Sequence, residues 1–226
     1  TQMSLLTRRG FLAATSASAA TLLLPAQLRA QPTRMTLSAT SRTIEVQGKA
    51  ATVWGLLDNK GRSGLVLDPG QAFAVDLTNT LDAPTIIHWH GLHTPARMDG
   101  HPGDTIAPGA RYEYDFIVRN RGGTYWYHTH AHELTAKQAY NGLASFFLVD
   151  DEDQRKLAKA LDLKLGVTDL PLVIQDKRFD ALGHLVYQPD MHESMMGWLG
   201  DIVLANLTPD DNGQLIHHDG RRASSW

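Results

Sequence analysis

The stretch Tyr112-Glu-Tyr-Asp-Phe-Ile-Val118 places apolar side chains at every second position, with acidic residues between the first three of them. A period of two is typical of a β-strand that buries one face. Residues 43–46 and 72–78 show the same alternation. Glycine-containing turn sequences separate these stretches, at 58–61, 68–70, 107–109 and 121–123. Short strands at this spacing predict an all-β fold, an antiparallel Greek-key sandwich over residues 35–150.

The composition limits the kinds of protein that this chain can be. Its 226 residues, 42% of them hydrophobic, suffice for one large domain or for one and a half small ones. The net charge of -3 argues against a nucleic-acid-binding surface. The sequence has no cysteine, which excludes disulfides, iron–sulfur clusters and thiolate metal ligands within it. Eleven histidines and six methionines are the remaining ligands for a borderline or soft metal.

Residues 1–30 have the features of an export signal. Arg8 and Arg9 precede Gly-Phe-Leu and an apolar stretch of small residues that reaches Pro25. Paired arginines in this context are typical of twin-arginine signals, and an ordinary secretory signal is the alternative. The apolar run is too short for a stable transmembrane helix. We expect cleavage after Ala30 and a periplasmic or extracytoplasmic protein, exported by the twin-arginine machinery and without a stable membrane anchor.

The second half of the chain predicts a second, incomplete β domain. The charged stretch 150–156 and a short helix reaching Leu163 favour a linker over residues 151–166. Residues 170–175 and 184–187 then predict a β-hairpin around the turn 180–183, followed by a strand at 200–206. Three strands cannot close a sandwich, so we expect a truncated second domain over 167–206. The polar stretch 207–226 loses the alternation and suggests a truncation or a shifted reading frame.

Two histidine pairs carry the chemistry of the sequence. His88-Trp-His90 and His128-Thr-His130 each place two imidazoles two residues apart in a predicted strand. Alternate residues of a strand lie on the same face, roughly 6.6 Å apart, so each pair is presented to one side. Imidazole binds copper, zinc, iron and nickel, and this spacing favours giving the two rings to neighbouring ions. The motifs predict a metal site of more than one ion, although a twisted strand can also direct both rings to a single ion.

With their neighbours, these motifs resemble the first domain of a multicopper oxidase. The resemblance rests on His88-Trp-His-Gly-Leu-His93, Asp99-Gly100 and Trp126-Tyr-His-Thr-His-Ala-His132, with Gln138 and residues 142–144. It extends over residues 40–206 and points to bacterial copper-efflux oxidases and laccase-like enzymes. The resemblance implies cupredoxin-like domains, a type 1 copper and a trinuclear copper cluster that reduces O₂ to water. Phenols or cuprous ions are the reducing substrates of such enzymes.

The resemblance also implies roles for individual residues. By motif position, His88 would bind the type 2 copper, and His90, His128 and His130 would bind the type 3 pair. Asp99 occupies the position of an acidic residue that helps deliver protons, and a plain turn aspartate is the alternative. His93 and His132 are expected to orient ligands or to form nearby hydrogen bonds. Tyr125, Trp126 and Tyr127 are expected to lie in the core and around the ligands.

The sequence also departs from that family pattern. The two later histidine motifs, one of them His-Cys-His, do not occur, and without a thiolate there is no type 1 copper within this sequence. The chain is therefore not expected to complete the oxidase reaction alone, and a partner chain supplying the missing ligands is not identified by the sequence. A non-catalytic copper-binding module is the alternative function. A zinc hydrolase, with His101 or His132 as a third ligand, is a further one.

Overall fold

The computed structural model describes residues 34–196, 200, 202–207 and 215–216. The predicted export signal over residues 1–30 and most of the polar stretch 207–226 lie outside these residues. Within the part that is described, no helix has the length and apolar character needed to cross a membrane.

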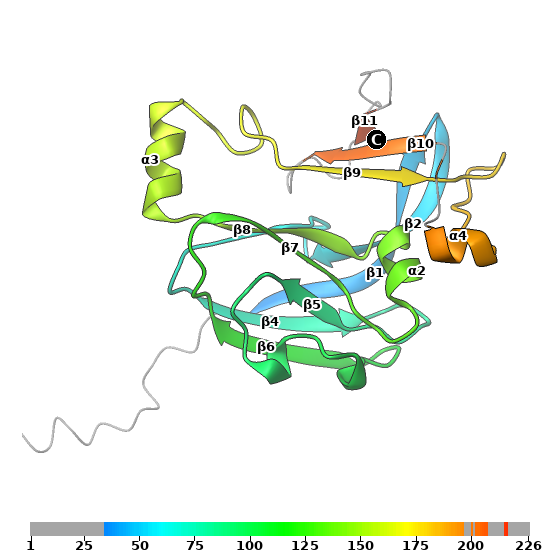
Figure 1. Ribbon diagram of the computed structural model, residues 1–226, viewed down its shortest axis with the longest axis horizontal. Helices are drawn as coiled ribbons and strands as arrows, with labels where there is room; N and C mark the ends of the chain where they lie inside the picture. Colours follow the sequence, from blue (N-terminus) through cyan, green and yellow to red (C-terminus); the bar gives the residue numbers. More distant parts are fainter. Residues whose placement is uncertain (1–33, 197–199, 201, 208–214, 217–226) are drawn as a thin grey trace, which may run out of the picture. The chain divides into compact units, whose positions relative to one another are not determined.

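One face of the first sandwich is a sheet of four strands in the order β2-β1-β4-β6. These strands are β1 (Met35–Val46), β2 (Lys49–Asp58), β4 (Ala72–Asn79) and β6 (Arg111–Ile117). The β1–β2 and β4–β6 pairs are antiparallel, whereas β1 and β4 run parallel. The alternating stretches 43–46, 72–78 and 112–118 lie in β1, β4 and β6, and Figure 1 shows β4 and β6 side by side.

The opposite face is a second four-stranded sheet in the order β3-β8-β7-β5. It contains β3 (Leu65–Leu67), β5 (Ile87–His90), β7 (Gly123–Thr129) and β8 (Ala144–Val149). Here β3 and β8 are parallel and the other pairs are antiparallel. The predicted all-β, cupredoxin-like sandwich is confirmed. The expectation of an entirely antiparallel sandwich is wrong, because two of its strand pairs join segments distant in sequence and run parallel.

Aromatic and aliphatic side chains from both sheets form a single core between them. Phe73 is fully buried and its ring contacts those of Trp89, Phe116 and Phe147 at centroid distances of 4.7, 4.7 and 5.4 Å. Trp89 lies between the two histidines of the first pair and points away from them into this core. Because Trp89 is packed in this core, β5 is held in place at the residue between its two histidines.

Short helices connect the strands. They are two 3₁₀ turns (η3, Ala96–Met98; η4, Pro102–Asp104), α2 (Thr135–Asn141), α3 (Glu152–Ala160) and α4 (Met191–Met196). The Asp151 carboxylate accepts a hydrogen bond from the backbone N–H of Gln154 and so caps the N-terminus of α3, in the predicted linker. The domain and linker boundaries given above stay predictions.

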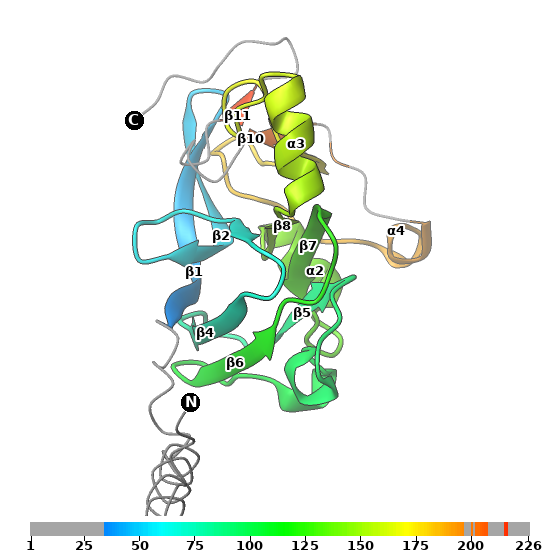
Figure 2. The same ribbon diagram turned by 90° about the vertical axis from the view of Figure 1, so that its left-hand side faces the viewer.

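Beyond α3, a third sheet has the order β11-β10-β9. Its strands are β9 (Leu172–Lys177), β10 (Ile202–Leu207) and β11 (Leu215–Ile216), and both pairs are antiparallel (Figure 1). Figure 2 shows β10 and β11 from the side. The predicted return strand at 184–187 is wrong: a single bridge joins Phe179 to Leu185. The Asp180 carboxylate accepts hydrogen bonds from two backbone N–H groups of the turn, and two backbone bonds flank the bridge. The strand β9 itself pairs with β10 along its whole length.

The far end of the β1–β2 hairpin contacts the segment around the third sheet. Ile44, Val46, Ala51 and Val53 form a small buried cluster. Phe179, Leu185 and Ile202 pack against it. The sandwich therefore shares apolar contacts with the third sheet, in addition to polar contacts through α2.

Candidate metal centre

The register between β5 and β7 gathers the histidines of the two motifs. His88 lies directly opposite His128, and His90 lies opposite Trp126. Because alternate residues share a face, the side chains of all four lie on one side of the sheet. Each motif therefore presents its histidines as the two-residue spacing predicts, and strand pairing brings the two motifs together.

Three of the four predicted ligands form a tight cluster. One ring nitrogen from each of His88, His90 and His128 lies within 4.8 Å of the others. Their ring centroids are 5.4 Å apart in each pair. His130 follows the end of β7, with its ring centroid 5.5 Å from that of His88 and 6.1 Å from that of His128. His130 thus borders the cluster without joining its tightest part.

A backbone carbonyl sets the orientation of the His88 ring. His88 Nδ1 donates to the main-chain oxygen of Asp99 over 2.8 Å, which leaves Nε2 with its lone pair free. The next residue, Gly100, has φ +74°, and a Cβ there would lie 2.1 Å from the carbonyl oxygen of Ile87. Only glycine permits this close approach of the turn to β5. The glycine thereby brings the Asp99 carbonyl to His88.

The Asp99 carboxylate also lies at the site. Its Oδ1 accepts a hydrogen bond of 2.7 Å from the Thr94 hydroxyl and lies 3.3 Å from His88 Nδ1. The side chain is nearly half exposed. Asp99 is therefore both a turn residue, through its backbone, and a carboxylate beside a candidate ligand, and its predicted part in proton delivery stays a prediction.

His128 is held in the complementary orientation. Its Nδ1 donates to the carbonyl oxygen of Thr129 over 2.7 Å, and its Nε2 lies 3.2 Å from His90 Nδ1. Burial lowers the pKa of the His128 imidazole, and the rings of the neighbouring histidines lower it further. A neutral imidazole is the form that binds a metal, so this environment keeps His128 competent at neutral pH.

Trp126 covers two of the candidate ligands. Its ring stacks on that of His90 at 4.9 Å with an interplanar angle of 27°, and on that of His128 at 4.3 Å and 31°. The expectation that Tyr125, Trp126 and Tyr127 lie in the core and around the ligands is confirmed for Tyr127, which is fully buried, and for Trp126, which stacks on two candidate ligands. Trp126 is 43% exposed because it lies on the histidine face of β7, away from the core.

A network of buried polar side chains contacts Thr129, the residue between the two histidines of the second pair. The Gln138 amide oxygen accepts hydrogen bonds from the hydroxyls of Thr129 and Thr85, and its NH₂ group donates to the carbonyl of Pro84 over 2.8 Å. Thr129 is the residue between His128 and His130, and both it and Gln138 are fully buried. In the sequence, Gln138 is recognisable only as part of a motif. Its role follows from α2 packing against β7, which local patterns do not report.

Tyr114 fixes the outer edge of β5. Its hydroxyl both donates to the carbonyl oxygen of Ile87 and accepts from the Ile87 N–H, each over 3.1 Å. Burial raises the pKa of Tyr114 far above its usual range, so the phenol stays protonated. β5 is four residues long and lies at the edge of its sheet, and this clamp satisfies backbone groups that pairing leaves open.

The other histidines named in the sequence analysis lie apart from the cluster. His101 accepts a hydrogen bond from the N–H of Gly103 at its own turn, and the exposed His132 lies 3.7 Å from a Glu133 oxygen. The backbone N–H of His93 donates to the Asn120 side chain over 2.9 Å. In the described part of the chain neither His101 nor His132 joins the three-histidine group, so the third ligand required by the zinc hydrolase alternative is not supplied by them.

The arrangement fits a nitrogen-binding metal. Two nitrogens bound to one ion at the usual 2.0–2.1 Å are roughly 3.2 Å apart in tetrahedral or similar geometry, and His90 Nδ1 and His128 Nε2 have this separation. His130 Nδ1 is buried and has no hydrogen-bond partner, a costly condition that a bound ion would relieve. Copper has the ligand preference that these imidazoles offer.

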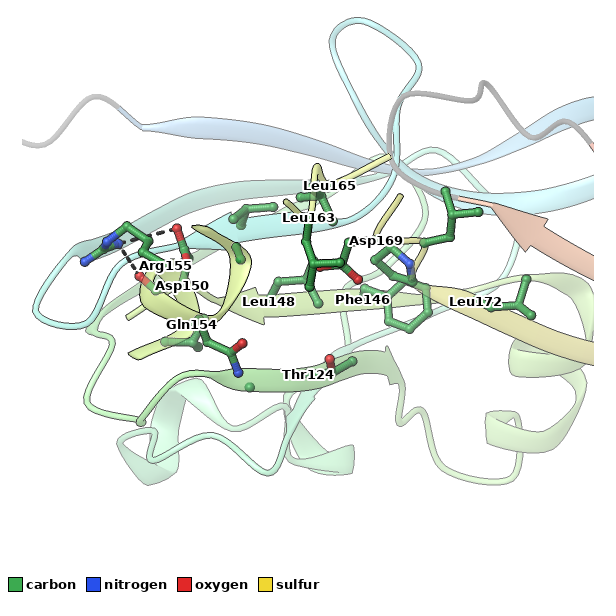
Figure 3. A pocket seen from close by; sticks show the side chains of 16 residues that line it. Thr124, Phe146, Leu148, Asp150, Gln154, Arg155, Leu163, Leu165, Asp169 and Leu172 are labelled. Atoms are coloured by element: carbon green, nitrogen blue, oxygen red, sulfur yellow. Dashed lines mark hydrogen bonds and ion pairs between the residues drawn. The ribbon is translucent and has the colours of Figure 1, made fainter. Parts of the chain in front are cut away.

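A separate pocket of about 430 Å³ lies on the same outer face of the β7–β8 surface as His128, farther along the strands, beside α3 and β9. Leu148 and Phe146 of β8, Gln154 and Arg155 of α3, and Leu172 of β9 line it (Figure 3). Arg155 is already paired, donating over 2.9 Å to Asp68 and over 2.6 Å to the carbonyl of Asp150. None of the four candidate ligand histidines lines this pocket, so it is not part of the candidate metal centre.

Comparison with known proteins gives the same picture as the site. A family model described as multicopper oxidase matches residues 38–154. The multicopper oxidase Mco of Staphylococcus aureus is 36% identical over 174 residues, which cover 74% of this chain and 37% of the relative. The cell division protein FtsP of Escherichia coli is 32% identical over 185 residues, covering 79% and 37%.

Solved structures of multicopper oxidases are similar to this chain as well. The crystal structure of the multicopper oxidase McoA from Aquifex aeolicus superposes with a TM-score of 0.74 at 41% identity, covering 80% of this chain and 40% of McoA. The chain thus spans about two fifths of the length of the relatives that it matches. With the family model covering more than half of the chain, and with a cupredoxin-like sandwich carrying the histidine cluster, the chain belongs to the multicopper oxidase family.

Proposed function

We propose that His88, His90, His128 and His130 bind copper and form part of the O₂-reducing centre of a multicopper oxidase. The observation that carries this proposal is the cluster of three imidazoles whose ligand nitrogens lie within 4.8 Å of one another. The matching family consists of copper-dependent oxidoreductases that use O₂, which supports copper over zinc at this cluster. Phenols or cuprous ions are the proposed reducing substrates of the whole protein.

By motif position, we assign His88 to a type 2 copper and the other three histidines to a type 3 pair. The separate anchoring of His88 by the Asp99 carbonyl, and the 3.2 Å approach of His90 to His128, support this division. Copper, when bound, supplies the one-electron redox chemistry that couples substrate oxidation to O₂ reduction. The chain's own groups hold the imidazoles in metal-binding tautomers, and Trp126 limits water at two of them. The Asp99 carboxylate is the proposed proton carrier.

The proposed activity of this chain alone is copper binding without the complete oxidase reaction. Its sequence has no cysteine, and a type 1 copper, through which electrons enter such enzymes, requires a thiolate. Ligands from elsewhere are then needed for four-electron chemistry. We further propose export through the twin-arginine pathway to the periplasm, on the basis of Arg8-Arg9 and the apolar segment that follows.

Copper titration of the metal-free chain tests the proposal. We expect binding of no more than two copper ions, Cu(II) resonances with nitrogen couplings, and no intense blue absorption. His128→Ala should weaken binding at least a hundredfold, because it removes the ring that contacts His90. His132→Ala is the matched control, since that exposed imidazole lies outside the cluster. Equal binding by the two variants would refute the assignment.

A non-catalytic copper-binding module is the second candidate function. Two observations favour it: the sequence has no thiolate ligand, and some relatives, such as FtsP, carry the name of a cell division protein. Oxygen consumption separates the two candidates. A copper-loaded chain that binds tightly and reversibly, but consumes no O₂ even when a reductant is supplied to the copper directly, supports the module.

A further inference from the structure

Lys177 is a buried lysine that the proposed copper chemistry does not use. It is 4% exposed and lies at the end of β9, in the third sheet. Its ammonium donates to the carbonyl oxygen of Tyr140 and lies 4.7 Å from the centre of the Tyr140 ring. The N–H of Arg178 donates to the Tyr140 hydroxyl over 2.7 Å. Two successive residues therefore hold Tyr140 at its backbone and at the tip of its side chain.

Tyr140 belongs to the last turn of α2, two residues after Gln138. In a helix, residues two apart project in roughly opposite directions. Tyr140 accordingly contacts the β9 end, whereas Gln138 contacts Thr129 of β7 and Thr85. α2 is thus a bridge of one and a half to two turns between the third sheet and the strand that carries His128 and His130.

The position of the ammonium suits a role in fixing this bridge. The carbonyl groups of the last helical turn have no partner within the helix and carry its partial negative charge, so a buried cation there is favourable. α2 has seven residues, and a helix of this length does not persist without tertiary contacts. Just beyond the same end of α2, Gly142 leaves no room for a side chain, since a Cβ would lie 2.3 Å from the Trp54 carbonyl oxygen. The C-terminal end of α2 is therefore held at two points.

Stability alone gives little reason for a lysine at this position. Burial lowers the pKa of Lys177 to about 8, which means that its charged form costs free energy. Replacing a buried charged group by an apolar residue of similar volume is often neutral or stabilising. The lysine therefore calls for another explanation, and its contact with α2 supplies one.

We propose that Lys177 is a positioning residue for the candidate metal centre: by holding Tyr140 it keeps Gln138 beneath Thr129, and so fixes the rings of His128 and His130. The third sheet then contributes to ligand geometry without contributing a ligand. The statement about ring geometry stands without any metal. Its consequence for copper affinity rests on the proposed function.

Nitrogen-15 NMR of the histidine rings in the full metal-free chain tests the positioning directly. We expect His128 to be in the Nδ1–H tautomer in the original chain, as its bond to the Thr129 carbonyl requires. In Lys177→Met we expect a mixture of tautomers, with an unfolding free energy at pH 7 that is not reduced. Lys164→Met, which changes an exposed lysine outside these contacts, should leave the spectrum unchanged.

Copper titration of the same variants gives the functional readout. We expect Lys177→Met to weaken Cu(II) binding about tenfold, and Lys177→Arg, which keeps a donor for the Tyr140 carbonyl, to recover most of the loss. If Lys177→Met fails to fold, Tyr140→Phe removes the hydroxyl that accepts from the Arg178 N–H and is expected to shift the His128 tautomer in the same direction.

The outcomes distinguish this inference from the proposed function. Unchanged His128 signals in folded Lys177→Met, or in folded Tyr140→Phe when the first variant does not fold, would overturn the positioning role. An original chain that binds no Cu(II) would refute the proposed function. The NMR comparison in the metal-free chain would still decide whether Lys177 orients the ring.

Discussion

The sandwich and the third sheet bury their apolar residues to very different degrees. In the sandwich, Phe73 and Trp89 are almost completely inaccessible and contact aromatic rings on several sides. In the third sheet, the β9 residues Leu172 and Ile174 are 45% and 66% exposed, on the same face of the strand. The histidine cluster lies on the sandwich, where ligands have rigid support. A site that needs fixed geometry is thus found on the part with a closed core.

The largest expected difference between the two regions is in stability. Phe73→Ala should reduce the free energy of unfolding by about 3–5 kcal/mol, because it opens a cavity between three rings. Ile174→Ala should change it by less than about 0.5 kcal/mol, because most of that side chain is already in water. Urea denaturation of both variants measures this. Similar losses would mean that the exposed face of β9 is covered in solution.

The pH dependence of stability should identify Lys177 as the exception within the third sheet. Its pKa is about 8 in the folded chain and 10.5 when unfolded, so the unfolded state binds more protons between these values and stability rises with pH across them. Below about pH 8 Lys177 is protonated in both the folded and the unfolded state. The full free-energy cost of burying its charge is then present.

Comparison with Lys177→Met isolates this contribution. Relative to the original chain, the variant should lose about 3 kcal/mol of stability between pH 7 and pH 10.5. Lys164→Met, at an exposed position, should show no such trend. A flat difference for both variants would mean that Lys177 is solvated.

A glycine beside the cluster should be more sensitive to substitution than a glycine at an open turn. Gly100→Ala combines a left-handed φ with a clash against the Ile87 carbonyl, and should cost about 2–3 kcal/mol. Gly109→Ala has nearly the same φ, +75°, and open space around it, so it should cost about 1 kcal/mol. Thermal denaturation measures the loss of stability in both variants. Equal losses would show that the turn at Gly100 moves easily away from the Ile87 carbonyl.

The smallest expected effect compares two exposed apolar residues, one in each region. Trp126→Ala should weaken copper binding about tenfold, or 1.4 kcal/mol, because two ligand rings lose their stacking partner. Leu172→Ala, at a similarly exposed residue of β9, should leave copper binding unchanged. Calorimetric titration of both variants measures the effect. An equal response would mean that Trp126 acts only as general apolar surface.

The sequence predicted the sandwich well because its strands carry a local signal. Alternation marked 72–78 and 112–118, which lie in β4 and β6, and the two-residue spacing placed each histidine pair on one face. The pairing of His88 with His128 is a matter of register between strands 40 residues apart, which local patterns do not encode. The return strand at 184–187 failed because alternation over four residues does not distinguish a strand from a single bridge.

The supporting residues of the site were the least predictable. Gln138 is one amide in a short helix, and its bonds to Thr129 and Thr85 exist only because α2 packs against β7. The position of Trp126 on the ligand face follows from the same alternation that placed the histidines, and could have been derived from it. Lys177 carried no signal at all, because a lysine in a strand predicts an exposed side chain.

The contact between His88 and Asp99 separates two roles within one residue. The main-chain oxygen of Asp99 orients the ring, and this atom is present whatever amino acid occupies position 99. The carboxylate is a separate group, which accepts a hydrogen bond from the Thr94 hydroxyl while the carbonyl holds the ring. Genetically, the two groups are separable: a change of side chain at position 99 removes the carboxylate and its bond to Thr94 but keeps the carbonyl, whereas a change at Gly100 moves the carbonyl itself.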